Sequence, residues 1–306
     1  MAAGRQMGRG DKEAVDQAAV DAMRLVLQTV DMDGVVVIGE GEKDEAPMLY
    51  IGEHIGNGNA PQVDVAVDPV DGTTLTANGL GGAISVVALA ERDSLFFSHV
   101  PYMDKLVVGP SAKGFVDIAA PVSDNVKAVA RASNRDVQDL TVVILNRPRN
   151  EPLVQEVRAV GARIRLIGDG DVAAGLMAIM EDHTGIDMLV GIGGAPEGVI
   201  TACTVRCLGG DMQARLWARH DDDTRMAESE GREIGRLLTL DDLCAGEKVF
   251  VAATGVTDGE LLRGVRYLTS GAVTDSIVMR SASGTVRRIE ARHDFSRLRK
   301  LAGTRY

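Results

Sequence analysis

Short runs of aliphatic residues recur along the chain, and acidic residues follow directly where several of these runs end. Glu40 follows the run at 35–38, and Asp68 follows the run at 63–67. Runs of four to eight β-branched residues that are bounded by turn formers are typical of buried strands. Segments with helical periodicity separate many of these runs, which predicts an α/β protein with crossover connections.

The predicted elements define a layered fold. Helices are predicted at 11–30, 46–51, 152–160, 172–180 and 221–236, and strands at 35–38, 63–67, 84–90, 105–109, 141–145, 163–167, 188–191, 249–253, 276–279 and 286–291. We expect an α/β (α+β) sandwich in which layers of helices and sheets alternate. The length of 306 residues predicts two domains, which we place at 1–135 and 136–306.

The balance of charges excludes several classes of partner. The chain has 33 basic and 44 acidic residues, a net charge of −11. Such a chain lacks the basic surface that nucleic-acid binding needs, and anionic membranes repel it. The sequence has no apolar run long enough to span a bilayer, and 3 cysteines are too few for a disulfide framework. We therefore expect a cytoplasmic protein that binds neither nucleic acid nor membranes.

The acids at strand ends predict a metal site. Ligands of α/β sheets bind beyond the carboxyl ends of the strands, so these acids are expected to converge there. Clustered carboxylates repel one another unless divalent cations separate them, and hard oxygen ligands suit Mg²⁺ or Mn²⁺.

The segment 68–74 (Asp-Pro-Val-Asp-Gly-Thr-Thr) is the sharpest motif in the sequence. Pro69 stiffens the turn, and Gly72 allows a ligand to approach the backbone closely. Thr73 and Thr74 then stand at a predicted helix start, where backbone N–H groups favour an anion such as phosphate. The structural alternative is a surface turn, since Asp, Pro and Gly are common in turns.

Together with Gly-Glu-Gly-Glu at 39–42, this segment resembles the lithium-sensitive, metal-dependent phosphatases of sugar and inositol phosphates. Two longer segments, 36–49 and 191–199, resemble the class II (GlpX-type) fructose-1,6-bisphosphatases of bacteria, as does Arg-Pro-Arg at 147–149. The similarity extends from residue 8 to beyond residue 290. It implies the sugar-phosphatase fold and hydrolysis of the 1-phosphate of fructose 1,6-bisphosphate, which yields fructose 6-phosphate and phosphate.

The resemblance also implies the residues of the site. The implied metal ligands are Asp16, Glu40, Asp68, Asp71 and Glu197. The implied substrate contacts are Asp71, Gly72, Thr73, Thr74, Tyr102, Arg147, Pro148, Arg149, Asp169, Gly170, Asp171 and Gly193. The implied catalytic residues are Asp68, Thr73 and Glu197. The first domain would bind the metals and the 1-phosphate, and the second domain would bind the sugar and the 6-phosphate.

The chemistry of these residues is consistent with metal-dependent hydrolysis of a phosphate ester. Two metals can hold an attacking water and a leaving oxygen in line. We expect Thr73 Oγ to position the water and a carboxylate to orient Thr73, with Thr74 as the alternative water-positioning residue. Arg147 and Arg149 can present paired guanidinium groups to a second phosphate.

Several structural alternatives accompany these assignments. The Arg-Pro-Arg segment could be a solvated loop, and Tyr102 could be a half-buried core residue. Asp169 and Asp171 could cap a helix, either in place of accepting hydrogen bonds from sugar hydroxyls or in addition to it.

Other functions stay as alternatives. Sedoheptulose 1,7-bisphosphate has the same end groups as the expected substrate, whereas an inositol monophosphate has no second phosphate for the arginines. A sensor that binds a sugar phosphate without turnover is the non-enzymatic alternative. Two short motifs compete weakly: 31–35 resembles a haloacid-dehalogenase nucleophile loop, and 168–173 resembles a dinucleotide-binding turn. The family resemblance further implies a homotetramer.

Overall fold

The chain forms two compact units in a computed structural model that describes residues 1–41, 48–180 and 184–302. Unit 1 comprises Met1–Ser94 and Glu247–Tyr306, and unit 2 comprises Leu95–Gly246. The predicted boundary after residue 135 does not coincide with this division. The two differ because the C-terminal part of the chain returns to the first sheet. The late strand β11 pairs with the early strand β4, so the C-terminal part completes the sheet that the N-terminal part begins.

Unit 1 is built on an eight-stranded sheet. Seven of its strands follow the order β12-β13-β11-β4-β3-β1-β2, and the eighth, β14, pairs with β13. Among the described residues, β1 and β3 pair in parallel and the other neighbours pair antiparallel. The strands are β1 (Asp33–Ile38), β2 (His54–Ile55), β3 (Gln62–Asp71), β4 (Ile84–Glu91), β11 (Phe250–Gly255), β12 (Arg266–Tyr267), β13 (Gly271–Arg280) and β14 (Thr285–Asp294).

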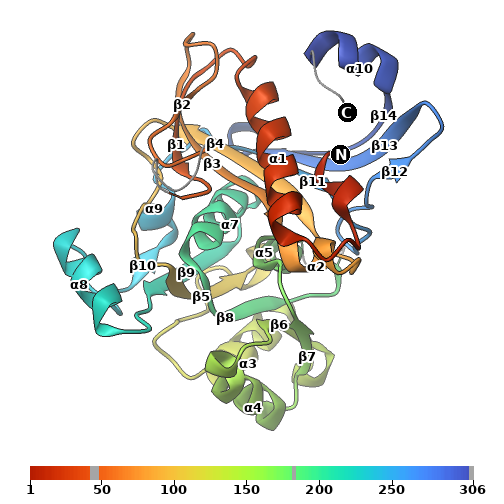
Figure 1. The fold of residues 1–306 in the computed structure, drawn as a ribbon. Coiled ribbons are helices and arrows are strands. Elements are labelled where there is room, and N and C mark those ends of the chain that lie inside the picture. Colours follow the sequence, from red (N-terminus) through yellow and green to blue (C-terminus); the bar gives the residue numbers. More distant parts are fainter. Residues whose placement is uncertain (42–47, 181–183, 303–306) are drawn as a thin grey trace. The chain divides into compact units, whose positions relative to one another are not determined.

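The long helix α1 (Lys12–Leu27) covers this sheet on one face (Figure 1). Its N-cap residue Asp11 accepts a hydrogen bond from Ala14 N at 3.0 Å, which satisfies one of the free N–H groups at the helix start. Buried Val20 and Leu27 pack with side chains of β1 and β3. Buried Val15 packs beside the short helix α2 (Thr73–Ala77). The apolar residues that follow the helical period here are buried or half-buried, except Val26, which is 52% exposed.

Unit 2 contains a six-stranded sheet with the order β10-β9-β5-β8-β6-β7. Strand β6 runs parallel to β7 and β8, whereas β5 runs antiparallel to β8 and β9. The carboxyl ends of β6, β7 and β8 therefore share one edge of the sheet with the start of β5. The strands are β5 (Tyr102–Val108), β6 (Thr141–Leu145), β7 (Arg163–Ile167), β8 (Met188–Gly194), β9 (Asp211–Leu216) and β10 (Leu238–Thr239).

Helices cover both faces of the unit 2 sheet (Figure 1). Helices α3 (Val122–Ser133) and α4 (Glu151–Val160) pack on one face, where Leu106 and Val108 of β5 join their core. Helices α5 (Asp171–Ile179) and α7 (Ala195–Leu208) pack on the other face. Two further helices are α8 (Asp221–Ser229) and α9 (Leu240–Leu243), and α10 (Phe295–Ala302) belongs to unit 1.

The α/β class and most predicted elements are confirmed, with several corrections. Helices α3 and α7 and strand β9 were not expected, and α8 ends at Ser229 instead of 236. The helix predicted at 46–51 lies partly outside the described residues, and residues 48–51 are not helical. No helix of the described residues is long and apolar enough to cross a membrane.

Candidate active site

Strand β3 carries two of the predicted metal ligands at its end. In the pairing with β4, Asp68 lies opposite Val86 and Asp71 lies opposite Ile84, so three steps on β3 match two steps on β4. This bulge changes the alternation of side chains by one residue. Asp68 and Asp71 therefore lie on the same face of the strand, although a spacing of three would put them on opposite faces of a regular strand.

Glu40 lies just beyond the carboxyl end of β1, at the same end of the sheet as Asp68. Strands β1 and β3 are parallel, with Ile38 opposite Ala66, so Glu40 and Asp68 each stand two residues beyond a paired position. The exposed Glu40 donates its backbone N–H to Leu49 O at 3.0 Å. Residues 42–47, which continue the motif around Glu40, lie outside the described residues.

Thr73 is held by a carboxylate of helix α1. Gly72 adopts a left-handed conformation (φ 98°) and turns the chain from β3 into α2. The Thr73 hydroxyl has two acceptors, Asp16 Oδ1 at 2.7 Å and Val70 O at 3.0 Å. The carboxylate that we expected to orient Thr73 is thus matched by Asp16. Helix α2 has only five residues, so backbone N–H groups rather than a long helix dipole would bind an anion here.

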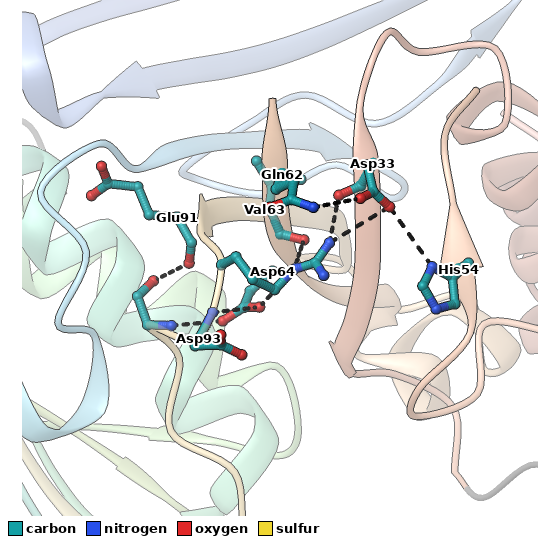
Figure 2. Close-up of polar contacts among 9 residues, drawn as sticks. Asp33, His54, Gln62, Val63, Asp64, Glu91 and Asp93 are labelled. Carbon is teal, nitrogen blue, oxygen red and sulfur yellow. Dashed lines mark hydrogen bonds and ion pairs between the residues drawn. The ribbon is translucent and has the colours of Figure 1, made fainter. Parts of the chain in front are cut away.

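The other end of β1 and β3 is also acidic, but its acids are bound to Arg92 (Figure 2). Arg92 Nη2 lies 3.7 Å from the Asp33 carboxylate and donates to the Asp33 backbone carbonyl at 2.6 Å. Its Nε lies 3.7 Å from the carboxylate of buried Asp64. Asp33 also accepts a hydrogen bond from Gln62 Nε2 at 3.0 Å. Asp33 begins a strand instead of following one. The haloacid-dehalogenase interpretation of 31–35 therefore lacks the required context.

Tyr102, at the start of β5, is flanked by two arginines. The guanidinium carbon of Arg149 lies 4.5 Å from the ring centroid, and that of Arg219 lies 5.0 Å from it. Trp217 contacts the same ring edge-on, with centroids 6.2 Å apart. Hydrogen bonds to Asp223 fix Arg219 and raise its pKa. Tyr102 is half-buried in this cluster.

The sequence did not single out Arg219. It lies three residues beyond the end of β9, and Leu216 at that end lies opposite Met103 of antiparallel β5. Trp217 is the only tryptophan in the sequence, and it was the one feature near Arg219 that could have drawn attention to this segment. The other arginine of the predicted pair, Arg147, donates to Asn146 O at 3.1 Å, and Pro148 opens a short 3-10 turn.

The Asp169–Asp171 segment joins β7 to α5 at the same edge of the sheet. Gly170 has a left-handed conformation (φ 81°), and Asp171 begins the helix with only 5% of its surface exposed. Asp171 does not cap that helix in the expected way, because its Oδ2 accepts a hydrogen bond from Lys105 Nζ. Lys105 is a second residue that sequence analysis missed. A lone lysine in an apolar strand gave no motif by which to find it.

Glu197 lies in the first turn of α7, directly beyond β8. Burial raises the pKa of its carboxyl, Asp171 raises it further, and Lys105 lowers it in part. Its Oε2 atom is buried and makes no hydrogen bond to the described residues. Such an atom needs a partner, and a bound cation is one that suits a carboxylate.

Among the described side chains, no group of three or more His, Cys, Asp or Glu is arranged to hold a metal. The chemistry of the predicted ligands nevertheless favours a hard cation. All the predicted ligands are carboxylates, the donors that Mg²⁺ and Mn²⁺ prefer. An α/β fold with acidic strand ends and a carboxylate-oriented threonine has the elements of a metal-dependent phosphatase.

The comparisons with known proteins give the family. The profile of the family described as "Bacterial fructose-1,6-bisphosphatase, glpX-encoded" matches residues 1–293. The chain is 44% identical over 304 residues to "Fructose-1,6-bisphosphatase 1 class 2" of Escherichia coli strain K12, covering 95% of this chain and 90% of that protein. The class 2 enzyme of Shigella flexneri matches to the same extent. This chain belongs to the bacterial, GlpX-type fructose-1,6-bisphosphatase family.

Proposed function

We propose that this chain hydrolyses the 1-phosphate of fructose 1,6-bisphosphate and releases fructose 6-phosphate and phosphate, a reaction of gluconeogenesis. The observation that carries the bisphosphate assignment is the Tyr102 ring with guanidinium groups at 4.5 and 5.0 Å. Gathered arginines in a chain of net charge −11 favour a ligand with a phosphate to bind there. The printed names of the relatives support the same substrate.

In unit 1, the proposed chemistry depends on the direction of one hydroxyl. When Thr73 donates its proton to Asp16 Oδ1, its oxygen is left with lone pairs that accept a hydrogen bond from a water molecule. A water held in this way directs its own lone pair away from Thr73. We propose that this water attacks the 1-phosphate, while backbone and side-chain donors at 71–74 hold the phosphate oxygens.

The proposed metal ligands are Asp16, Glu40, Asp68 and Asp71 of unit 1 and Glu197 of unit 2. Without cations these carboxylates would repel a phosphate. When bound, Mg²⁺ or Mn²⁺ would lower the pKa of the attacking water and neutralise charge on the leaving oxygen. One oxygen of Asp16 accepts the Thr73 proton, so Asp16 would serve the metal through its other oxygen. The buried Oε2 of Glu197 supports its inclusion.

In unit 2, we propose that Tyr102, Arg147, Pro148, Arg149 and the newly found Arg219 surround the 6-phosphate. Asp169, Gly170, Asp171 and Gly193 would contact the sugar, since all four lie at the edge that the ends of β7 and β8 share. Binding of the remote phosphate supplies energy for orienting the reacting one.

The state of the protein in the cell is also proposed. Sugar bisphosphates are charged metabolites, so an enzyme that consumes them is expected in the cytoplasm. The family resemblance supports a homotetramer, which sedimentation velocity would test, and the acidic charge argues against nucleic-acid binding.

A substrate panel tests the proposed function. Phosphate release is measured with fructose 1,6-bisphosphate, sedoheptulose 1,7-bisphosphate, fructose 1-phosphate and inositol 1-phosphate, each with Mg²⁺ and with Mn²⁺. A coupled assay for fructose 6-phosphate identifies which phosphate is removed. We expect the highest kcat/KM for fructose 1,6-bisphosphate and stoichiometric fructose 6-phosphate. A clear preference for inositol 1-phosphate would contradict the role of the arginines, and binding without turnover of any substrate would indicate a sensor.

A further inference from the structure

Lys105 is a buried cation that no motif explains. It lies in the middle of the apolar strand β5 with 2% of its surface exposed. Its ammonium donates to Asp171 Oδ2 and to Gly194 O, the latter at 3.1 Å. Asp171 begins α5, and Gly194 is the N-cap residue of α7. One side chain therefore connects the starts of two helices whose first turns carry proposed site residues.

The position of this ammonium is unfavourable for stability alone. A helix has positive partial charge at its N-terminus, so a cation at the start of the 14-residue helix α7 is repelled by the helix dipole. Desolvation of both charges adds a further cost, and well-packed apolar residues often replace a buried ion pair without loss of stability. Stability alone therefore does not account for this ion pair.

The backbone around Lys105 is shaped to admit it. A Cβ atom on Gly193 would lie 2.1 Å from Asp171 Oδ2 and 2.7 Å from Lys105 Nζ. A Cβ atom on Gly198 would lie 3.1 Å from Lys105 Cδ and 2.3 Å from Met103 Sδ. Glycine at these two positions lets the strand end and the helix start close tightly around the ion pair, so Asp171 has little freedom to move.

We propose that Lys105 is a positioning residue for sugar binding, which acts through Asp171 and through the start of α7. The ammonium occupies one carboxylate oxygen of Asp171 and thereby fixes the direction in which the other oxygen points. It also anchors the Gly194 carbonyl, and so the turn that carries Glu197. This inference rests on the proposed function, because it takes Asp171 as a contact of the sugar.

The test compares Lys105→Met with Lys127→Met, a control in which an exposed lysine loses its surface partner Asp124, the one ion pair that it makes to the described residues. Two readouts are used. The first is KM and kcat for fructose 1,6-bisphosphate. The second is the affinity for fructose 6-phosphate without added metal, followed by the fluorescence of Trp217, the only tryptophan, whose ring packs edge-on to Tyr102. We expect Lys105→Met to raise KM and weaken fructose 6-phosphate binding at least tenfold, with kcat changed less than KM.

Lys105→Arg is a second variant, which separates an effect on substrate binding from a failure of Lys105→Met to fold. Arginine retains the charge and the donors, but its larger head group has little room beside Gly193, where an added Cβ would already lie 2.7 Å from Lys105 Nζ, so we expect Asp171 still to be displaced and KM still to rise. If Lys105→Met gives no cooperative unfolding transition, Lys105→Arg decides. Wild-type KM and wild-type fructose 6-phosphate affinity in a folded Lys105 variant would overturn the inference. A wild-type protein that releases no phosphate from fructose 1,6-bisphosphate would instead overturn the proposed function.

Discussion

Thr73 has one hydroxyl proton and two acceptors, Asp16 Oδ1 at 2.7 Å and Val70 O at 3.0 Å. Only one of them can receive the proton at a time. Asp16 is the stronger acceptor if it is ionised, because charge-assisted hydrogen bonds are about twice as strong as neutral ones. The oxygen of Thr73 is then polarised toward accepting a hydrogen bond from water, which is the role that the proposed reaction assigns to it.

Replacing Thr73 with Ala should therefore lower kcat by about 100- to 1,000-fold, the range found when one positioned polar group is removed from an active site. KM should stay within about threefold, because backbone groups bind the phosphate. Thr73→Ser, which keeps the hydroxyl, is the matched control and should retain most of the turnover. Steady-state kinetics check both variants. Normal turnover in Thr73→Ala would show that Thr73 does not position the attacking water and would favour Thr74 for that role.

The arginines beside Tyr102 should affect binding more than turnover. Arg149→Ala and Arg219→Ala are each expected to raise KM for fructose 1,6-bisphosphate by about 10- to 100-fold, since a hydrogen bond to a charged group contributes about 1.5–3 kcal/mol. Arg225→Ala is the control, because Arg225 is exposed and pairs only with nearby Asp222 among the described residues. An unchanged KM in both test variants would place the 6-phosphate elsewhere.

At the scale of single elements, the turn from β3 into α2 determines where Thr73 stands. Gly72 has φ 98°, and a Cβ there would lie 3.1 Å from Leu75 Cδ1 and 3.2 Å from Ala83 Cβ. The left-handed conformation costs a residue with a Cβ roughly 1–2 kcal/mol. Any relief of that strain would rotate the turn and move the Thr73 hydroxyl away from Asp16.

Gly72→Ala should accordingly lower the melting temperature by a few degrees and reduce kcat severely. Gly58→Ala is the control, since Gly58 shares the left-handed conformation (φ 81°) but has no atom within 4 Å of the added Cβ. Differential scanning calorimetry and kinetics are measured on both. The control should lose stability without losing turnover. Equal turnover in the two variants would show that the conformation of this turn does not position the catalytic group.

Strands were predictable because their aliphatic runs are short and end in turn formers, and α1 was predictable from its amphipathic period. Helix α7 was not, because 10 of its residues, from Ala195 to Cys207, are buried and a helix that is buried on all sides has no polar face. Helix α3 also escaped prediction, although its buried positions follow the helical period. The charged segment after 229 turns at Gly231 (φ 68°), which the charge pattern alone does not reveal.

For the whole molecule, the sequence located acids and motifs but not the partners that other strands bring to them. Asp16 and Thr73 are 57 positions apart, and Lys105 and Asp171 are 66 apart. Local patterns carry no information about such pairs. The return of the chain to its first sheet through β11 likewise depends on strand pairing, so a boundary placed at the middle of the sequence could not match the two units.

The net negative charge of the whole chain bears on how it can bind an anionic substrate. The proposed site would hold a highly anionic sugar bisphosphate among carboxylates in a chain of net charge −11, so we expect that cations are needed for binding. We therefore expect catalysis to require a divalent metal, and metal binding should also stabilise the folded state by mass action.

The most direct measurement is phosphate release from fructose 1,6-bisphosphate before and after chelation, with the melting temperature recorded on the same samples. EDTA should abolish phosphate release and lower the melting temperature. Excess Mg²⁺ or Mn²⁺ should restore both, and Asp68→Asn should respond to neither metal. Full activity in EDTA-treated, metal-free protein would contradict the account.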